Sequence, residues 1–263
     1  MPVHVKDGGT WRESSGIHVK DGGTWRDIQE GHIKDGGTWR QWHSGVNTLT
    51  ITCNGGSPSG SGGRNYCTWD VAGGVTFYHS TGGPGCGNMA RVDVGSPGNG
   101  NELIIAGGGG GEGSQTGGTG GQGGGANATN GGPKPNCQGG GGGTTNNSGY
   151  GPGGSGGSGG NHSGRGCSGS GGGYFTGAPA CYGGGCGGAG YYGGGSGGSN
   201  FDSNTGGGGG GGSGLIRNWT LPGDVSNETG ASFNTGSTQG GPAITYDLNG
   251  SATTYTSPGS FTV

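Results

Sequence analysis

Residues 151–161 read GPGGSGGSGGN and residues 206–212 read GGGGGGG, and stretches of this type decide the fold of the middle of the chain. The recurring unit is Gly-Gly-x, with a period of three. Only 11 prolines occur in the whole chain, which argues against a collagen triple helix. A period of three matches an extended left-handed helix with three residues per turn. Two faces of such a helix carry no side chain, so neighbouring backbones can approach and hydrogen-bond.

The same pattern extends over residues 107–214, with further runs GGTGGQGGG (117–125), GGGCGGAG (183–190) and GGGSGGS (193–199). A flexible glycine linker is the alternative interpretation. The tract is too long for a simple linker, however, and connections rich in aromatic residues and asparagine separate its runs. Ordering so much glycine costs chain entropy, which only a dense network of backbone hydrogen bonds can offset. We therefore expect a stacked lattice of extended helices.

Composition limits what the rest of the chain can be. Glycine occupies 84 of 263 positions and hydrophobic residues make up 24%, far below the roughly 45–50% of ordinary globular domains. A conventional core is therefore expected in only part of the chain. The net charge of −3 and the lack of a basic stripe argue against a nucleic-acid partner. No apolar run reaches the roughly 18 residues of a transmembrane helix, so no membrane insertion is expected.

The fold class that we predict is mostly β and irregular structure. An N-terminal β domain is expected over residues 1–106, comprising a short triple repeat (1–43) and a small β region (44–106). The glycine-rich domain spans 107–214 and a closing segment spans 215–263. Alternating or β-branched patterns predict strands at 46–53, 73–80, 101–107, 242–250 and 252–263.

The triple repeat reads HVKDGGTWR at 4–12 and 18–26, then HIKDGGTWR at 32–40. Asp-Gly-Gly is a turn signal between short alternating segments, so each unit predicts a β-hairpin. One hairpin is marginal in water, so the three units either support one another or pack on a partner. The repeated tryptophan and arginine are then either core residues or anchors for that partner. These residues are Trp11, Trp25, Trp39, Arg12, Arg26 and Arg40.

Taken together, the KDGGTWR units, the β region and the ordered glycine runs resemble the tip adhesins of T-even-type phage long tail fibres. The resemblance covers essentially the whole chain. It implies that the N-terminal domain attaches to the distal subunit of the trimeric long tail fibre, with one copy per fibre tip. It also implies a sandwich of packed polyglycine-II helices, whose connecting loops bind a bacterial outer-membrane protein or, alternatively, lipopolysaccharide. Such a protein is made in the host cytoplasm and resides in the virion.

The candidate receptor-binding residues lie between the glycine runs. Aromatic rings are not expected to be buried among glycines, and exposed rings beside Asn and Ser are typical of binding loops. The alternative is that some rings cover the lattice edges. If neighbouring helices alternate in direction, only every second loop can reach the tip. The candidates are Asn146, Asn147, Tyr150, His162, Tyr174, Phe175, Tyr182, Tyr191, Tyr192 and Phe201.

Nothing in the sequence predicts an enzyme, a cofactor or a metal site. Matches to G-x-G-x-x-G lack a strand-turn-helix context, and the six histidines and the carboxylates do not converge on a pattern. The seven cysteines have no histidine at a zinc-like spacing. No secretory signal is visible in MPVHVKDGG, so reduced thiols are the default, and disulfides between some pairs remain open.

Three functions therefore remain: a fibre-tip adhesin, a fibre-assembly chaperone, and a free-standing polyglycine structural or ice-binding protein. The triple repeat favours the first. One chain on the end of a three-fold symmetric fibre faces a symmetry mismatch, and three similar units let it present the same contact to each subunit.

Overall fold

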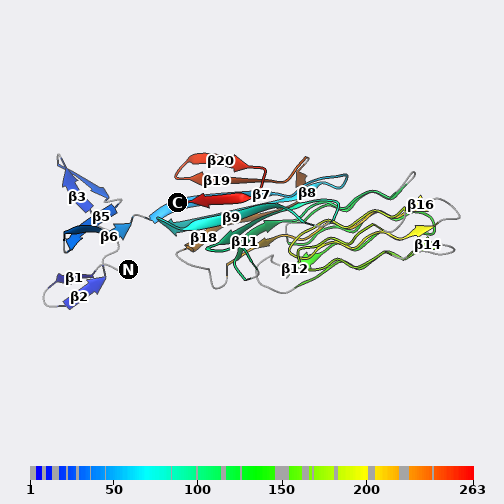
Figure 1. Cartoon of the computed structure of the whole chain (residues 1–263), viewed down its shortest axis with the longest axis horizontal. Helices are drawn as coiled ribbons and strands as arrows, with labels where there is room; N and C mark the ends of the chain where they lie inside the picture. Colours follow the sequence, from blue (N-terminus) through cyan, green and yellow to red (C-terminus); the bar gives the residue numbers. More distant parts are fainter. Residues whose placement is uncertain are drawn as a thin grey trace.

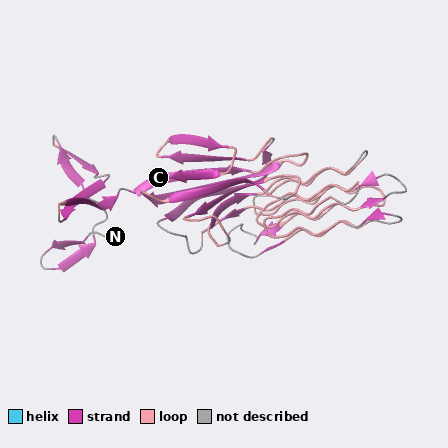
Figure 2. Cartoon of the chain, in the orientation of Figure 1, coloured by secondary structure: helices cyan, strands magenta, loops and turns pink. Residues whose placement is uncertain are grey.

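The computed structural model describes residues 4–263, except 8–9, 14–17, 22, 28–29, 36, 45, 84, 99, 114–116, 125, 146–153, 162–165, 168, 181–182, 201–204, 219–224 and 239. Over these residues the chain is mostly β-strand and extended or turn structure, with no helix (Figure 2). The expectation of a mostly β and irregular fold is therefore confirmed.

Ten strands form two five-stranded antiparallel sheets, which pack as a β-sandwich (Figure 1). The first sheet has the order β18-β8-β7-β19-β20, with β7 at Val46–Asn54, β8 at Gly62–Ala72, β18 at Val225–Thr238, β19 at Ala243–Leu248 and β20 at Ser251–Tyr255. The second has the order β17-β11-β10-β9-β21, with β9 at Thr76–Gly82, β10 at Met89–Val94, β11 at Glu102–Ala106, β17 at Leu215–Ile216 and β21 at Gly259–Thr262.

Strand periodicity explains the core of the sandwich. Along β7, Leu49, Ile51 and Cys53 are fully buried while the alternate threonines face outward, as a period of two requires. Buried residues of both sheets form one hydrophobic cluster, which includes Trp69, Phe77, Val92, Ile104, Ile244 and Tyr246. The main core thus lies in the sandwich, and a second, smaller cluster lies where the sandwich joins the glycine tract.

Strands from both ends of the sequence share these sheets. β19 pairs with β7 and β18 with β8, while β21 pairs with β9 and β17 with β11. The sequence did not indicate β8, β10 or β18 as strands. The last of these is rich in serine, asparagine and glycine, and it shifts register repeatedly along β8.

The glycine tract is inserted between two neighbouring strands of one sheet. We call the described part of residues 107–214 the glycine bundle. The chain leaves β11 after Ala106 and returns into β17, where Ile105 lies opposite Leu215. The amide groups of Gly212 and Gly209 then donate to the carbonyls of Gly108 and Gly111, both at 2.9 Å. The pairing therefore continues from the sheet into the bundle without a change of register.

Backbone hydrogen bonds in the bundle follow a period of three. The N–H groups of Gly107 and Gly110 donate to Gly124 and Gly121, whereas those of Gly108 and Gly111 donate to Ala189 and Cys186. Successive N–H groups thus point to different neighbouring segments, and the residue three positions further on returns to the first neighbour. In a β-ladder, by contrast, every second residue hydrogen-bonds to the same neighbouring strand.

The run of seven glycines lies at the centre of this network. Residues 207–213 donate hydrogen bonds to three segments and residues 206–213 accept them from three others, and all of 206–213 are buried. The segments that accept are 108–111, 129–132 and 192–198, and those that donate are 118–124, 140–143 and 185–191. Every face of the central segment therefore meets another backbone, which leaves no direction for a side chain.

Three β-hairpins precede the sandwich in the sequence. Figure 1 draws them beyond the end of the sandwich that lies away from the glycine bundle. They are β1-β2 (His4–Asp7, Thr10–Glu13), β3-β4 (His18–Asp21, Thr24–Asp27) and β5-β6 (Glu30–Asp35, Thr38–Ser44). Each is a separate two-stranded sheet. The register is the same in all three, with Lys6 opposite Trp11, Lys20 opposite Trp25 and Lys34 opposite Trp39. The tryptophan and arginine side chains of the repeat lie outside what the structure describes.

Candidate functional site

The glycine bundle has a near end at the sandwich and a far end away from it (Figure 1). Its segments run alternately outward and inward. Gly107 pairs with Gly124 beside β11, whereas Gly113 pairs with Gly118 at the far end. Three short strands mark the far end, namely β14 (Gly166–Cys167), β15 (Ser199–Asn200) and β16 (Thr205–Gly206).

This alternation assigns each connection to one end. The described flanks of 162–165, 181–182 and 201–204 lie at the far end, as does the turn at 133–138. The flanks of 146–153 lie at the near end, because β12 (Thr144–Thr145) and β13 (Gly154–Ser155) are there and the Thr145 hydroxyl donates to Gly214 O at 2.7 Å. Six candidates, Asn146, Asn147, Tyr150, His162, Tyr182 and Phe201, lie outside the described residues.

The described turn at the far end is held by its own backbone and by one cysteine. Lys134 and Cys137 exchange two backbone hydrogen bonds of 2.9 Å, and Asn136 between them has a φ of 63°. The buried Cys137 donates its S–H to Thr205 O at 3.3 Å, which ties the turn to β16. Pro133, Pro135 and Asn136 are exposed. No pattern in the sequence indicates that Cys137 anchors a surface turn.

Four aromatic candidates meet at the near end. The Tyr174 ring lies 3.9 Å from Phe175, 5.0 Å from Tyr191 and 5.7 Å from Tyr192, between ring centroids. Tyr191 is only 4% exposed and packs with Met89, Ile105, Ala189 and Leu215. The expectation that these rings avoid burial is wrong for Tyr191, because the sandwich supplies apolar side chains where the bundle joins it. Tyr174 is 37% exposed.

A buried charged group lies beside these rings. The Arg91 guanidinium sits 4.1 Å from the centre of the Phe175 ring and donates to Asp93 at 2.7 Å and to Gly98 O at 2.7 Å. The Tyr174 hydroxyl donates to Glu102 at 3.1 Å. Burial raises the pKa of Asp93, and the neighbouring Arg91 partly opposes that rise. These contacts fix the loop after β10 and fasten the aromatic rings to the sheet.

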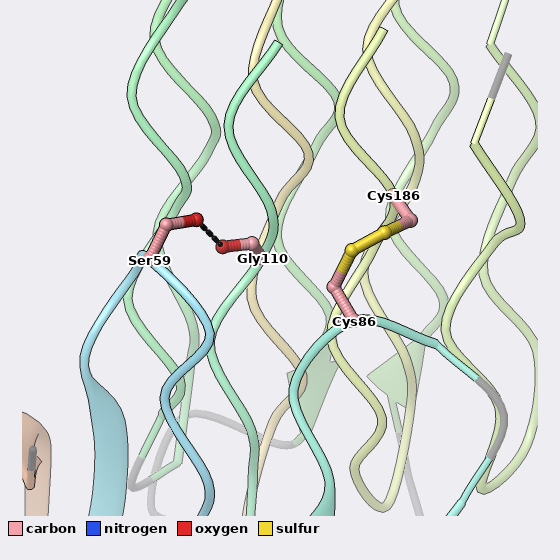
Figure 3. The surroundings of a disulfide bond; sticks show 4 residues. All are labelled: Ser59, Cys86, Gly110 and Cys186. Atoms are coloured by element: carbon pink, nitrogen blue, oxygen red, sulfur yellow. Dashed lines mark hydrogen bonds between the residues drawn. A yellow bond between two sulfur atoms is a disulfide. The ribbon is translucent and has the colours of Figure 1, made fainter. Parts of the chain in front are cut away.

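A disulfide joins the sandwich to the bundle, between Cys86 in the β9–β10 connection and Cys186 in a glycine segment (Figure 3). The Cα atoms are 5.5 Å apart. Backbone bonds flank the disulfide, from Cys86 N to Gly187 O at 3.0 Å and from Ala189 N to Gly87 O at 2.9 Å. Cys53, Cys67 and Cys137 are free and buried. The sequence left open whether any cysteines form a disulfide, and in the structure Cys86 and Cys186 do.

The β7–β8 connection also enters the bundle, which the sequence analysis missed. Gly60 N donates to Gly110 O at 3.0 Å, and the Ser59 hydroxyl donates to the same carbonyl at 3.2 Å (Figure 3). Residues 55–63 read GGSPSGSGG, so the glycine signal was present but lay inside the segment assigned to the β region.

A scan against protein-family models, a search of curated proteins and a search of solved structures gave no match to this chain. Within the described residues, no three His, Cys, Asp or Glu side chains are grouped as a metal site would require. The same residues include no helix of the length and apolar character needed to span a membrane.

Proposed function

We propose that this protein is a non-enzymatic adhesin at the tip of a phage long tail fibre, and that its glycine bundle is a lattice of packed polyglycine-II helices. The observation that carries the proposal is the hydrogen bonding around residues 206–213, which has a period of three and reaches a different neighbour with each successive residue. A lattice of this kind needs no apolar core, so its connections are free to vary in sequence without unfolding the domain.

The ends of the molecule support a division of labour. The three hairpins lie at one end, and the turn at 133–138 and strands β14, β15 and β16 lie at the other (Figure 1). We therefore assign attachment to the hairpins, against the distal subunit of the trimeric fibre with one copy per tip. Recognition of an outer-membrane protein, or of lipopolysaccharide, is assigned to the far-end connections, which include Lys134, Asn136, His162, Tyr182 and Phe201. The protein then resides in the virion.

The near-end aromatic residues take a different role in this proposal. Tyr191 is buried against the second sheet, and Tyr174 is hydrogen-bonded to Glu102. We assign this cluster to holding the lattice on the sandwich. The described flanks of 146–153 lie at the near end, so in this proposal Asn146, Asn147 and Tyr150 contribute less to receptor contact than the far-end candidates do.

A host-range exchange tests the proposal. The far-end connections 133–138, 162–165, 181–182 and 201–204 are replaced together by those of a fibre-tip adhesin with another host, and 146–153 is replaced alone as the matched control. The far-end exchange should change the plating efficiency and the adsorption rate to those of the donor's host range. The control exchange should leave both unchanged. Transfer of host range by 146–153 would contradict the assignment of ends. Virions that lack the protein but keep full adsorption would overturn the function itself.

A further inference from the structure

A cavity of about 340 Å³ lies on the outer side of the second sheet, over β9 and β10. Its floor is a rectangle of four side chains. Strand register places Ser80 opposite Arg91 and Tyr78 opposite Asp93. Two loops frame this floor and contribute Pro97 and Pro258. The cavity lies on the sandwich, so it is separate from the far-end connections of the glycine bundle.

The geometry of the floor matches one sugar ring in size. Directly opposed residues of an antiparallel pair have Cβ atoms about 5 Å apart, and alternate residues along one strand are about 7 Å apart. A rectangle of these dimensions is comparable to the footprint of a pyranose. The two prolines restrict the loops that form the rim, so the cavity is largely formed before a ligand arrives.

The polar groups of the floor are buried and already held in place. The Arg91 and Asp93 side chains are 10% and 7% exposed and are joined by a bond of 2.7 Å. Arg91 also donates to Gly98 O, and Gly98 N donates to Asp93 at 3.3 Å. A guanidinium offers only donors and a carboxylate only acceptors. Side by side, they suit a ligand whose neighbouring hydroxyl groups each donate and accept.

The charge of the floor disfavours an anionic ligand. Arg91 is paired with Asp93 at 2.7 Å and lies 3.7 Å from the buried carboxylate of Glu102, so no positive charge is left without a partner. The His79 ring faces the interior of the sandwich, where it contacts the Tyr246 hydroxyl, and burial lowers its pKa. Tyr78 adds an aromatic ring and Ser80 a hydroxyl group, and pockets that bind small polar ligands combine such groups. We propose that this cavity binds one pyranose unit of a neutral glycan.

Saturation-transfer NMR on the full-length protein tests this inference, with glucose, galactose, mannose and N-acetylglucosamine as separate probes and glucuronate as the charged comparator. At least one neutral sugar should show saturation transfer with a millimolar dissociation constant. Tyr78→Ala and Ser80→Ala should each weaken binding at least tenfold. Tyr66→Ala, which removes a 37% exposed tyrosine from the other sheet, is the matched control and should bind as the wild type does.

Three results would overturn the inference: no transfer to any neutral sugar, stronger binding of glucuronate, or unchanged binding by the Tyr78→Ala, Ser80→Ala double variant. Circular dichroism and the unfolding midpoint of each variant show whether a loss of binding is due to misfolding. A variant that misfolds is replaced by Tyr78→Leu or Ser80→Gly, to which the same criteria apply. Failure here leaves the proposed adhesin function intact, because the host-range exchange does not touch this cavity.

Discussion

At the scale of single residues, the glycine bundle contains positions of very different tolerance. A Cβ atom on Gly209, in the central segment, would overlap the carbonyl oxygen of Cys186. A Cβ atom on Gly171 would meet only the carbonyl oxygen of Gly157, at an ordinary contact distance of 3.4 Å. The clash at Gly209 is with backbone on a neighbouring segment, so no side-chain rotation can relieve it. Chemically identical substitutions should therefore differ sharply in effect.

We expect Gly209→Ala to lower the free energy of unfolding by about 3 kcal/mol or more, because overpacking against a fixed backbone costs this much. Gly171→Ala should be neutral or stabilise by up to about 1 kcal/mol, since it restricts the unfolded chain. Urea denaturation of the two variants and the wild type measures the difference. Equal losses in both variants would mean that the bundle is not packed as described.

At the scale of elements, the disulfide and its flanking hydrogen bonds form one joint between sandwich and bundle. The bond closes a loop with a sequence separation of 100 residues. Because the two flanking backbone bonds persist without it, the joint should weaken without coming apart. We expect the Cys86→Ser, Cys186→Ser double variant to stay folded and to lose about 2–4 kcal/mol of unfolding free energy.

Denaturation with and without dithiothreitol checks this expectation. Reduced wild type should match the double variant, and the double variant should be insensitive to the reductant. A variant that responds to the reductant as strongly as wild type would show that another cysteine pair carries the effect. The buried thiols Cys53 and Cys67 provide a further control, because each is unpaired and replacing either one should leave the response to reductant unchanged.

The hairpins make a second prediction at this scale. Each two-stranded sheet has the same register and one tryptophan at the same place. Under the proposed attachment role, replacing Trp11, Trp25 and Trp39 together by Ala should release the protein from fibres, and single replacements should have weaker effects, because equivalent anchors share the binding energy. Trp42→Ala, just outside the repeated unit, is the matched control. Retention of the triple variant on purified virions would limit the repeat to a folding role.

At the scale of the whole molecule, local patterns in the sequence were informative where the physics is local. The Gly-Gly-x period indicates where backbones can approach one another: the x residues Thr119, Gln122, Ser155 and Ser158 are exposed, whereas Ala189 and Ser196, at x positions of inner segments, are buried. The Asp-Gly-Gly sequences connect the paired strands of three two-stranded sheets, as a local turn signal suggests. In each case the decisive neighbours are within a few residues of one another.

Features that depend on distant partners were not predictable from the sequence. Tyr191 is buried because Met89, Ile105 and Leu215 converge on it from the sandwich. Cys86 and Cys186 have a sequence separation of 100 and meet only where the bundle contacts the sandwich. The seven-glycine run has no sequence feature that distinguishes it from the other runs, and its central place depends on the segments around it. The location of the candidate receptor-binding residues was not predictable for the same reason. Whether a connection lies at the near or the far end depends on how many times the chain has reversed direction before it.

The adjacency of β11 and β17 has a consequence for how such proteins diversify. Everything between residues 107 and 214 starts and finishes at two neighbouring positions of one sheet, Ile105 and Leu215. Recombination at these two points can transplant a complete, differently decorated lattice onto an unchanged sandwich and set of hairpins. The segment around Cys86 and residues 55–61 belong to the sandwich but contact the bundle, so they would have to fit the backbone of any transplanted lattice. A successful graft therefore needs only two junctions in the sequence, but it must also preserve the contacts that these sandwich segments make with the bundle.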